Sequence, residues 1–303
     1  MSLSAQISWV AVDWGTSHLR VWLMDSANTV LAGRQSTDGM SRLATNEYGD
    51  ALYRLVPELD GRKQIPVICC GMVGSRQGWA EAPYAQAPCK PLGIDAATCL
   101  QDGALNVRIL PGVKQMSPPD VMRGEETQIA GFLEAHSGFD GVICLPGTHS
   151  KWVHISAGEI VSFRTFMTGE MFDLLGRQSV LRHSIAEDGW DVNAFESALS
   201  DALSRPGDIA ARLFSLRAAQ LVGDQSPQTA RAKLSGLLVG IELAAARPYW
   251  LGQPIAIIGA DALAQIYADA LVAQGGAVTR VSGLDITLQG LCAAYSQIKE
   301  NTE

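Results

Sequence analysis

Apolar residues fall along the chain in two kinds of pattern. Short apolar or alternating blocks are typical of strands, and segments with apolar residues every three or four positions are typical of helices. In the first part of the chain they predict strands over 7–13, 19–25, 29–35, 65–70 and 107–110, with a helix over 46–56. In the second part they predict a helix over 125–136, strands over 142–145, 151–156 and 160–167, and helices over 172–182, 192–204, 209–216 and 228–246. The end of the chain alternates between strands over 255–259 and 278–281 and helices over 261–274 and 286–299. This order predicts an α/β protein built around a mainly parallel sheet.

Two segments break the regular pattern. Residues 71–91 are rich in glycine and proline, and a loop of that length in a compact domain usually binds something. Pro111-Gly112 and Pro118-Pro119 predict a hinge, so we place a domain boundary there. The expected domains are an N-terminal lobe over 1–115 and a C-terminal lobe over 116–303, and whether the last helix packs back on the first lobe is left open.

Composition narrows the class of protein. The chain has 303 residues, 47% of them apolar, which is enough for two domains with substantial cores. The net charge of −8 and the lack of lysine and arginine runs argue against nucleic-acid binding. No segment approaches the ~20 apolar residues that span a bilayer, and no signal peptide is evident, so we expect a cytoplasmic protein without membrane contact. The six scattered cysteines indicate neither a zinc site nor a disulfide framework.

The turn after the first predicted strand carries groups that suit a phosphate. Asp13 ends the strand, and Gly15, Thr16 and Ser17 follow. Glycine lets backbone N–H groups approach phosphate oxygens, the hydroxyls can donate, and the carboxylate can hold magnesium through water. Capping of the turn is the structural alternative for Asp13. Arg20 is a further candidate for phosphate contact, with a solvated surface position as its alternative.

A second copy of this arrangement follows the strand predicted over 142–145. Gly147 and Thr148 form the turn, and another apolar strand follows. One such turn alone is most often an ordinary β-turn. Two copies with matching flanks favour a pair of phosphate clamps that face one cleft and hold the same triphosphate.

The duplicated halves resemble the actin, hsp70 and sugar-kinase superfamily. Within it, five segments spread over essentially the whole chain are similar to the 2-dehydro-3-deoxygalactonokinase family: DWGTSHLRVWLMD, GMVGSRQGWAEAPYAQAPC, DVMRGEETQIAGFL, LPGTHSKWV and FRTFMTGEMFDLL. The resemblance implies an α/β, two-lobed actin-like ATPase (ribonuclease H-like) fold with duplicated β-hairpin and sheet halves and an interlobe cleft. It also implies ATP and Mg²⁺ as cofactors, and transfer of phosphate to the 6-hydroxyl of 2-dehydro-3-deoxy-D-galactonate in galactonate catabolism.

The resemblance also suggests where the catalytic base lies. Related kinases place Gly-Asp at the start of an interdomain helix, and this chain has Gly124-Glu125-Glu126 there. Glu125 occupies the position of the aspartate, and Glu126 remains the alternative. A second interpretation is that both carboxylates only complement the helix dipole. In-line phosphoryl transfer depends mainly on positioning, so a carboxylate with an ordinary pKa can serve as the base.

A sugar acid carries its own carboxylate, which requires a local cation. Arg76 in the irregular loop is the leading candidate, because a guanidinium can hold a carboxylate with two parallel hydrogen bonds. The other candidates for contact with the substrate are Ser75, Trp79, Glu81, Tyr84 and Arg123. Loop packing or surface exposure is the structural alternative for these residues. Gly259, in a strand-to-helix turn, resembles the family's adenosine segment.

The sequence leaves other functions open. A kinase of the same superfamily could act on another sugar acid or polyol, because fold and phosphate clamps do not select the acceptor. A non-catalytic actin-like sensor is a second alternative. The expected partners are therefore ATP and a sugar acid, and a homodimer is left open.

Overall fold

The structure is a computed structural model that describes residues 3–61, 64–91 and 94–300. Contacts divide the chain into two compact units. Unit 1 comprises Met1–Phe139, Ile155–Ser162 and Gly283–Glu303, and unit 2 comprises Asp140–His154 and Phe163–Ser282. Residues 116–139 therefore group with unit 1, whereas the expected boundary assigned them to the C-terminal lobe. No helix in the described ranges has the length and apolar character needed to cross a membrane.

Unit 1 is built on a six-stranded sheet with the order β3-β2-β1-β4-β7-β6. Its strands are β1 (Trp9–Trp14), β2 (Leu19–Met24), β3 (Val30–Ser36), β4 (Ile65–Gly71), β6 (Thr98–Asp102) and β7 (Leu105–Ile109). Strand β1 pairs antiparallel with β2 and parallel with β4. The sheet is therefore mixed and not mainly parallel: the antiparallel pairs β1–β2 and β2–β3 belong to the hairpins that the sequence predicted, whereas β6, antiparallel to β7, was not among the predicted strands.

Both faces of this sheet are covered, which explains why β1 is almost wholly apolar. Val10, Val12 and Trp14 pack in one core with α2 (Tyr48–Leu55). Trp9 and Ala11 pack in a second core with α10 (Gly283–Glu300). Successive side chains alternate between faces, so the register of β1 directs Asp13 to the α10 side.

A small third sheet has the order β5-β8-β9, with β5 (Tyr84–Gln86), β8 (Gly112–Met116) and β9 (Pro119–Met122). Strands β8 and β9 form an antiparallel hairpin in which Val113 pairs with Met122. This hairpin occupies the segment predicted as a hinge. Pro119 is compatible with it because it is the first residue of an edge strand, where no ladder N–H is needed.

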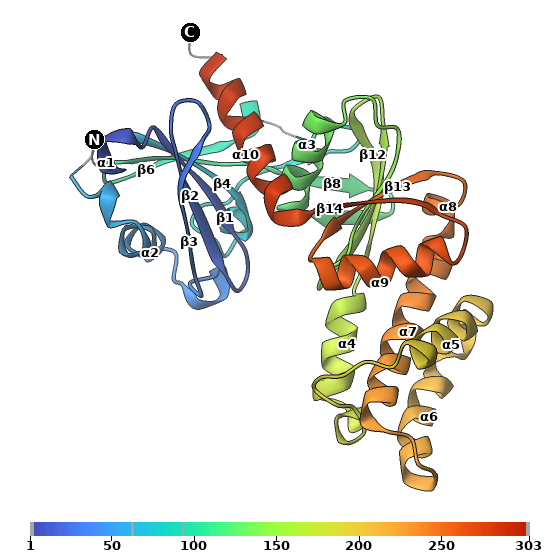
Figure 1. Cartoon of the computed structure of the whole chain (residues 1–303). Coiled ribbons are helices and arrows are strands. Elements are labelled where there is room, and N and C mark those ends of the chain that lie inside the picture. Colours follow the sequence, from blue (N-terminus) through green and yellow to red (C-terminus); the bar gives the residue numbers. More distant parts are fainter. Residues whose placement is uncertain (1–2, 62–63, 92–93, 301–303) are drawn as a thin grey trace. The chain divides into compact units, whose positions relative to one another are not determined.

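The remaining helices of unit 1 are α1 (Leu3–Gln6) and α3 (Glu125–Ala135), with short 3₁₀ turns at η1 (Met40–Arg42), η2 (Pro57–Leu59), η3 (Met72–Gly74) and η4 (Ile94–Ala96). Helices α3 and α10 lie side by side (Figure 1). Their crossing is close: a Cβ on Gly131 would overlap the carbonyl oxygen of Ile286, and one on Gly290 would overlap that of Thr127. Larger residues at either glycine would push the two helices apart.

The second large sheet has five strands in the order β12-β11-β10-β13-β14, and all of it belongs to unit 2 except the part of β11 and β12 within Ile155–Ser162. Its strands are β10 (Gly141–Leu145), β11 (Ser150–Ser156), β12 (Glu159–Phe166), β13 (Pro254–Gly259) and β14 (Ala277–Ser282). The order repeats that of β3-β2-β1-β4-β7, which is the duplication that the sequence predicted. Strands β10, β13 and β14 run parallel, so their carboxyl ends share one edge.

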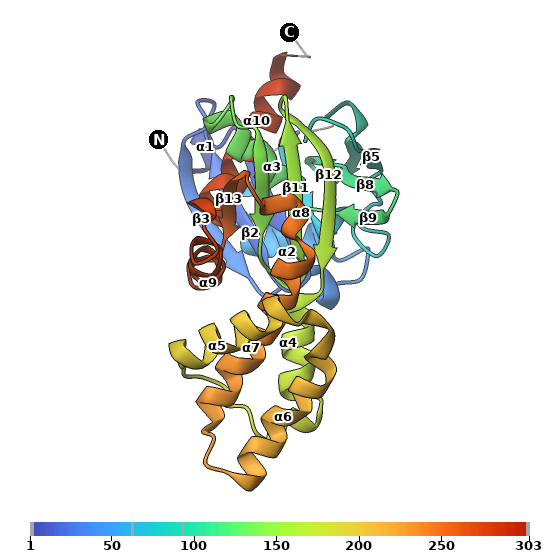
Figure 2. The ribbon, with the colours of Figure 1, turned by 90° about the vertical axis from the view of Figure 1, so that its right-hand side faces the viewer.

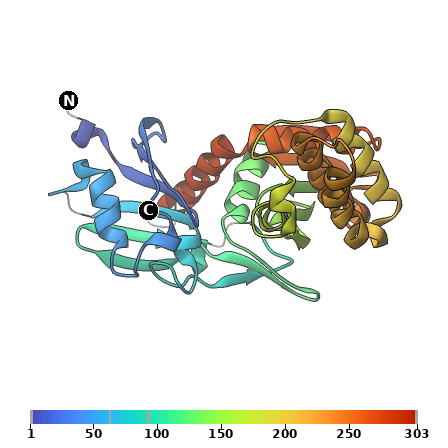
Figure 3. The ribbon, with the colours of Figure 1, turned by 90° about the horizontal axis from the view of Figure 1, so that it is seen from below.

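Unit 2 also carries most of the helices. They are α4 (Thr168–Arg177), α5 (Val192–Ser204), α6 (Ile209–Val222), α7 (Pro227–Ala245), α8 (Arg247–Trp250) and α9 (Asp261–Val272), with 3₁₀ turns η5 (Val180–His183) and η6 (Pro206–Asp208). Helices α4 to α7 form a bundle (Figure 2), which Figure 3 shows from its lower end. Helix α7 continues from this bundle into the core beneath the sheet, where Val239 and Leu243 pack with Trp152 and Tyr267.

Candidate active site

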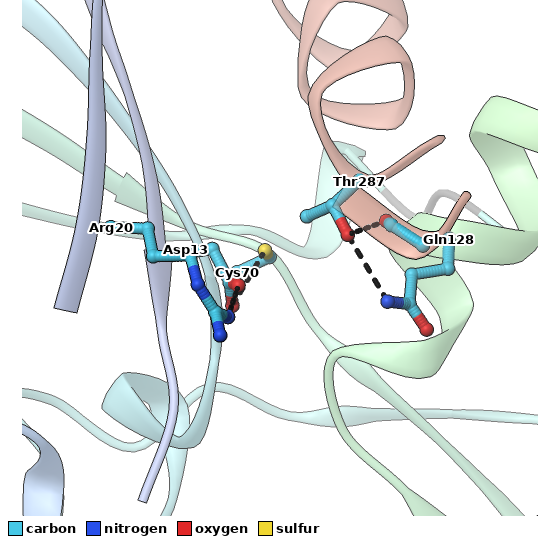
Figure 4. A network of polar contacts seen from close by, with 6 residues as sticks. Asp13, Arg20, Cys70, Gln128 and Thr287 are labelled. Carbon is cyan, nitrogen blue, oxygen red and sulfur yellow. Dashed lines mark hydrogen bonds and ion pairs between the residues drawn. The ribbon is translucent and has the colours of Figure 1, made fainter. Parts of the chain in front are cut away.

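Asp13 and Arg20 form an ion pair at the carboxyl end of β1. The two residues are direct neighbours across the β1–β2 hairpin, and Arg20 Nη1 lies 2.9 Å from Asp13 Oδ2. Cys70 Sγ, on the adjacent strand β4, lies 4.0 Å from Asp13 Oδ1 (Figure 4). The pair is only partly buried, since the Arg20 side chain is 38% exposed. Arg20 thus contacts the aspartate that the sequence proposed for a metal.

The surroundings of Asp13 disfavour an unbalanced negative charge. Burial raises the pKa of Asp13 above its ordinary value of 3.8, although Arg20 lowers it, and the nearby charge of Glu125 raises it further. The carboxylates of Asp13 and Glu125 therefore repel each other at this edge of the sheet. A cation placed there would relieve their repulsion.

The backbone of the turn Gly15–Ser17 is held by hydrogen bonds, while its hydroxyl side chains are exposed. Gly15 N donates to His18 O at 2.9 Å, and the carbonyl oxygens of Gly15 and Thr16 accept from Met40 N and Ser41 N, each at 3.0 Å. The side chains of Thr16 and Ser17 are exposed. The hydroxyls of this turn are available to a ligand while its backbone is held in place.

Two glycines bring the start of α3 against the end of β4. Gly71 has φ 90°, and a Cβ there would lie 2.8 Å from Trp14 O. Gly124 has φ 110°, and its Cβ would lie 3.3 Å from the Cα of Gly71. Glycine alone adopts these backbone angles readily and leaves room for the approach. As a result Glu125, the first residue of α3, is close enough to Asp13 to influence its pKa.

The two glutamates at the start of α3 have different surroundings. Glu126 is fully buried, and both of its carboxylate oxygens accept from Gly124 N at 2.8 Å. Burial, with a contribution from the charge of Glu125, raises the pKa of Glu126 to about 7. Glu125 is partly exposed, and its Oε2 accepts from Arg123 N at 3.0 Å. Glu126 is thus engaged with backbone, and Glu125 is the one that solvent or a ligand can reach.

Helix α10 holds α3 through a polar contact as well as through the glycine crossing. Gln128 Nε2 donates to Thr287 Oγ1 at 3.1 Å, and Thr287 Oγ1 donates to Gly283 O at 2.7 Å (Figure 4). Gln128 lies one helical turn after Glu125. The position of Glu125 therefore depends on a helix that is far away in sequence.

The two arginines proposed near the substrate differ in burial. The Arg76 side chain is 82% exposed, and its nearest acidic partner, Glu81, is 3.7 Å away. Arg123 is only 9% exposed. Its Nη2 donates to Ala82 O at 2.8 Å, its Nε donates to Tyr84 Oη at 3.4 Å, and its guanidinium stacks on the Tyr84 ring, 4.2 Å from the centroid. The structure therefore connects Arg123, which precedes α3, to the irregular loop.

Two polar atoms in this region are buried without a partner in the described chain. They are Arg123 Nη1 and Ser75 Oγ. A Cβ on Gly74 would lie 2.8 Å from Arg123 Nη1, so the arginine reaches the segment that carries Ser75. Buried polar groups are nearly always satisfied, so these atoms indicate a place for an additional polar group.

Trp79 lies in the core of unit 1. It is 8% exposed, stacks on Tyr48 at 5.8 Å and meets Trp14 edge-on at the same distance. Its ring thus packs the core below the loop, which was the structural alternative for this residue. Glu81 and Tyr84 lie nearer the surface.

Unit 2 places its own three predicted residues together. Gly147 and Thr148 follow β10, and Thr148 is exposed. Gly259 ends the neighbouring parallel strand β13, and a Cβ on it would lie 3.4 Å from Pro146. The Gly147 turn and the Gly259 turn therefore lie at one edge of one sheet, as phosphate and adenosine contacts would require.

The residues predicted for metal, phosphate and catalysis form one group in each unit, whereas among the loop candidates Trp79 lies in the core and Arg76 is exposed. The group in unit 1 joins Asp13, Arg20, the Gly15–Ser17 turn and the glutamates of α3, and the group in unit 2 joins the two turns just described. That the two Gly-Thr turns face one cleft stays a prediction. Sequence reasoning missed Gln128 and Thr287, although the spacing of three residues from Glu125 places Gln128 on the same side of the helix.

Comparison with known proteins identifies the family. A family model described as 2-keto-3-deoxy-galactonokinase matches residues 13–294. A probable 2-dehydro-3-deoxygalactonokinase of Rhizobium meliloti is 40% identical over 96% of this chain and 97% of the relative. The 2-dehydro-3-deoxygalactonokinase of Escherichia coli is 35% identical over 91% of this chain and 93% of the relative.

Solved structures agree with this result. The crystal structure of a putative 2-dehydro-3-deoxygalactonokinase from Sinorhizobium meliloti superposes with a TM-score of 0.89 at 38% identity, covering 96% of this chain and 99% of the other. Component A of the (R)-2-hydroxyglutaryl-CoA dehydratase of Acidaminococcus fermentans has a TM-score of 0.50 at 12% identity, covering 95% and 98%, and shares the fold alone. The duplicated sheets are those of the actin-like ATPase and sugar-kinase fold. The chain therefore belongs to the 2-keto-3-deoxy-galactonokinase family and is a kinase.

Proposed function

We propose that this protein uses ATP and Mg²⁺ to phosphorylate 2-dehydro-3-deoxy-D-galactonate at its 6-hydroxyl, by in-line transfer, in galactonate catabolism. The family supports the sugar acid as acceptor. The observation that carries the chemistry is the start of α3, where two close glycines bring Glu125 beside Asp13 at the open edge of the sheet.

The residues around Asp13 fit a magnesium ion. In the described part of the chain no three histidine, cysteine or acidic side chains cluster as a metal cage. Magnesium rarely needs one, because it usually binds through one or two carboxylates, phosphate oxygens and water. Asp13 supplies such a carboxylate, partly exposed and close to a second negative charge. When bound, the ion would neutralise charge on the phosphates during transfer.

The two Gly-Thr turns would hold the phosphates of ATP. Thr16 and Ser17 offer exposed hydroxyls on a turn whose backbone is fixed, and Thr148 does so on the turn of unit 2. Arg20 adds a half-exposed guanidinium beside Asp13. Gly259, adjacent to Pro146, leaves space for the ribose or the purine.

Glu125 would act as the general base. Its carboxylate would accept the proton of the attacking 6-hydroxyl as the bond from that oxygen to the γ-phosphorus forms, while the bond from the γ-phosphorus to the bridging oxygen breaks and ADP leaves. A loose transition state needs this acceptance late, so position matters more than a raised pKa. Glu126 is unsuited to the role because both of its oxygens accept from Gly124 N inside the protein. Glu126 would instead hold the backbone that orients Glu125.

Arg123 is better placed than Arg76 to hold the carboxylate of the sugar acid. Arg76 is largely in water and faces Glu81, where solvent screens its charge. Arg123 is buried and has no carboxylate within ion-pair distance among the described residues, and its Nη1 is unsatisfied near Ser75. A carboxylate at this point would satisfy both orphan atoms. Small movements of the loop would have to open the path, because neither atom is exposed.

Glu125→Gln tests the proposal. The amide keeps the size of the side chain but cannot accept the proton, so kcat should fall about 10²- to 10⁴-fold while ADP affinity stays within about twofold. Glu134→Gln is the matched control, since it changes an exposed glutamate on the same helix. Phosphorus NMR of the product identifies the phosphorylated position. An unchanged kcat would remove Glu125 as the base, and a neutral sugar phosphorylated better than the sugar acid would contradict the proposed substrate.

A further inference from the structure

A buried carboxylate lies beneath the Gly147 turn of unit 2, and neither the phosphate contacts nor the proposed base makes use of it. Glu242 on α7 is 1% exposed. Its Oε1 accepts from Trp152 Nε1 at 2.8 Å, and its Oε2 accepts from Tyr267 Oη at 2.7 Å and from Thr168 Oγ1. Burial raises the pKa of Glu242, whereas its hydrogen bonds with Thr168, Trp152 and Tyr267, and a weaker one with Ser150, act to lower it.

The hydrogen bonds form a chain with one direction. Tyr267 has a single hydroxyl proton and donates it to Glu242, so Ser150 Oγ, 3.1 Å away, must donate to Tyr267 Oη. Ser150 Oγ then has lone pairs free to accept from Gly147 N, which lies 3.5 Å away. The chain therefore runs from the Gly147 N–H through Ser150 and Tyr267 to Glu242. It connects the first residue of the turn to the carboxylate.

Glu242 also holds the second segment that touches the turn. Thr168, one of its donors, is the first residue of α4. In the same helical turn, Glu170 N donates to Thr148 O at 2.9 Å, and a Cβ on Gly169 would overlap Gly147 O. The start of α4 thus packs directly on Gly147 and Thr148. The carboxylate of Glu242 therefore holds the Gly147 turn by two routes, one through Tyr267 and Ser150 and the other through Thr168 at the start of α4.

The chemistry of the group is what makes this arrangement informative. Around Glu242 the core of unit 2 is apolar, with Leu243, Val239 and Cys144. Burying a carboxylate there is costly unless several donors satisfy it. A charged carboxylate only accepts hydrogen bonds, so it forces every hydroxyl in the chain to donate toward it. A glutamine at this position could both donate and accept, so it would not fix which hydroxyl donates in each hydrogen bond.

We propose that Glu242 is a positioning residue for nucleotide binding: through Tyr267 and Ser150, and through Thr168, it sets the backbone of the Gly147-Thr148 turn that contacts the phosphates of ATP. This rests on the proposed function, which assigns phosphate to that turn. The assignment makes a selective prediction, because the chain reaches the nucleotide side only. Breaking the chain of hydrogen bonds should weaken the binding of ATP and leave the binding of the sugar acid unaffected.

The test compares two variants that each remove one donor to the same carboxylate. Tyr267→Phe breaks the chain to Ser150, and Trp152→Phe removes a donor that does not reach the turn. Tyr267→Phe should raise the KM for ATP and the Kd for ADP about five- to tenfold, with the KM for the sugar acid within about twofold. Trp152→Phe removes a larger part of the core and should cost at least as much stability, with ADP affinity within about twofold of the unmodified protein. Ser150→Ala, a smaller change in the same chain, should repeat the result of Tyr267→Phe.

Calorimetry with ADP separates this inference from the kinase proposal. If Tyr267→Phe and Ser150→Ala bind ADP as the unmodified protein does, or if Trp152→Phe weakens ADP equally, Glu242 only stabilises the fold and the inference is overturned, with the kinase intact. An unmodified protein that binds no nucleotide would overturn the proposed function, and the inference with it.

Discussion

The two Gly-Thr turns occupy equivalent places in two copies of one sheet, yet their surroundings differ. The Gly15 turn follows β1 and lies beside a partly exposed ion pair of Asp13 and Arg20. The Gly147 turn follows β10 and lies above a fully buried network that ends on Glu242. In the first copy the carboxylate is at the open edge, where a ligand can meet it. In the second the carboxylate is inside, where it can act only through other residues.

This difference leads us to infer that the two turns have different functions, the first in the chemical step and the second in nucleotide binding. A carboxylate beside a turn can hold a metal and take part in chemistry. One beneath a turn can only fix its shape. Changes at the first turn should therefore lower kcat, and changes at the second should weaken nucleotide binding.

The strongest test of this division is Asp13→Asn. The amide retains the size of the side chain but loses the charge that would attract magnesium, so kcat should fall at least about 100-fold and the Mg²⁺ concentration for half-maximal rate should rise. Rates measured across a magnesium titration give both values. If the variant instead loses only ATP affinity, with kcat unchanged, the two turns do not differ in the way proposed.

A smaller effect is expected at the two arginines that are candidates for holding the carboxylate of the sugar acid. Arg123→Met should raise the KM for the sugar acid about 10- to 100-fold, because losing the charge-assisted hydrogen bonds between a buried guanidinium and a carboxylate costs about 1.4 to 2.7 kcal/mol. Arg76→Met, the exposed counterpart, should change it less than about threefold. Steady-state kinetics with the sugar acid varied and ATP saturating provide the comparison. A larger effect at Arg76 would show that Arg76, and not Arg123, binds the carboxylate of the sugar acid.

The last prediction concerns the pH dependence of stability at Glu126 and leaves activity aside. Its pKa is raised from 4.5 to about 7 in the folded protein, so its contribution to stability is complete below pH 4.5 and is lost as pH rises through 7. The loss amounts to at most about 3 kcal/mol. Urea unfolding at pH 5 and pH 8 should show the unmodified protein losing more stability over this range than Glu126→Gln, which cannot titrate. A constant difference between the two proteins would show that Glu126 does not titrate in this range.

Much of the fold could be predicted because its signals are local. Buried strands such as Ile65–Gly71 read as continuous apolar runs, and the limits of Val192–Ser204 follow from helical spacing. The hairpin of Gly112–Met116 and Pro119–Met122 could not be predicted in the same way. Its strands are short and its prolines are typical of turns, so edge-strand proline was taken for a hinge.

The candidate site shows the same limit. Asp13 and Glu125 could be proposed from the sequence because a turn motif and a helix start mark them, and the structure places them close together. The distinction between Glu125 and Glu126 was not available, since neighbouring residues of one type differ only in which way the fold turns them. Arg123 was among the candidates from the sequence, but its preference over Arg76 depends on contacts with distant residues such as Ala82. Glu242 was not predicted, because its partners, such as Trp152, lie far along the chain and no local pattern reveals them.

The close crossing of α3 and α10 has a consequence for folding during synthesis on the ribosome. The six strands of the unit 1 sheet and the helix that bears Glu125 are all synthesised by residue 135, but Thr287 and Gly290, on which that helix packs, are synthesised about 150 residues later. All of unit 2 is translated in between. The contacts that seat the start of α3 on α10 can therefore form only after unit 2 has been synthesised.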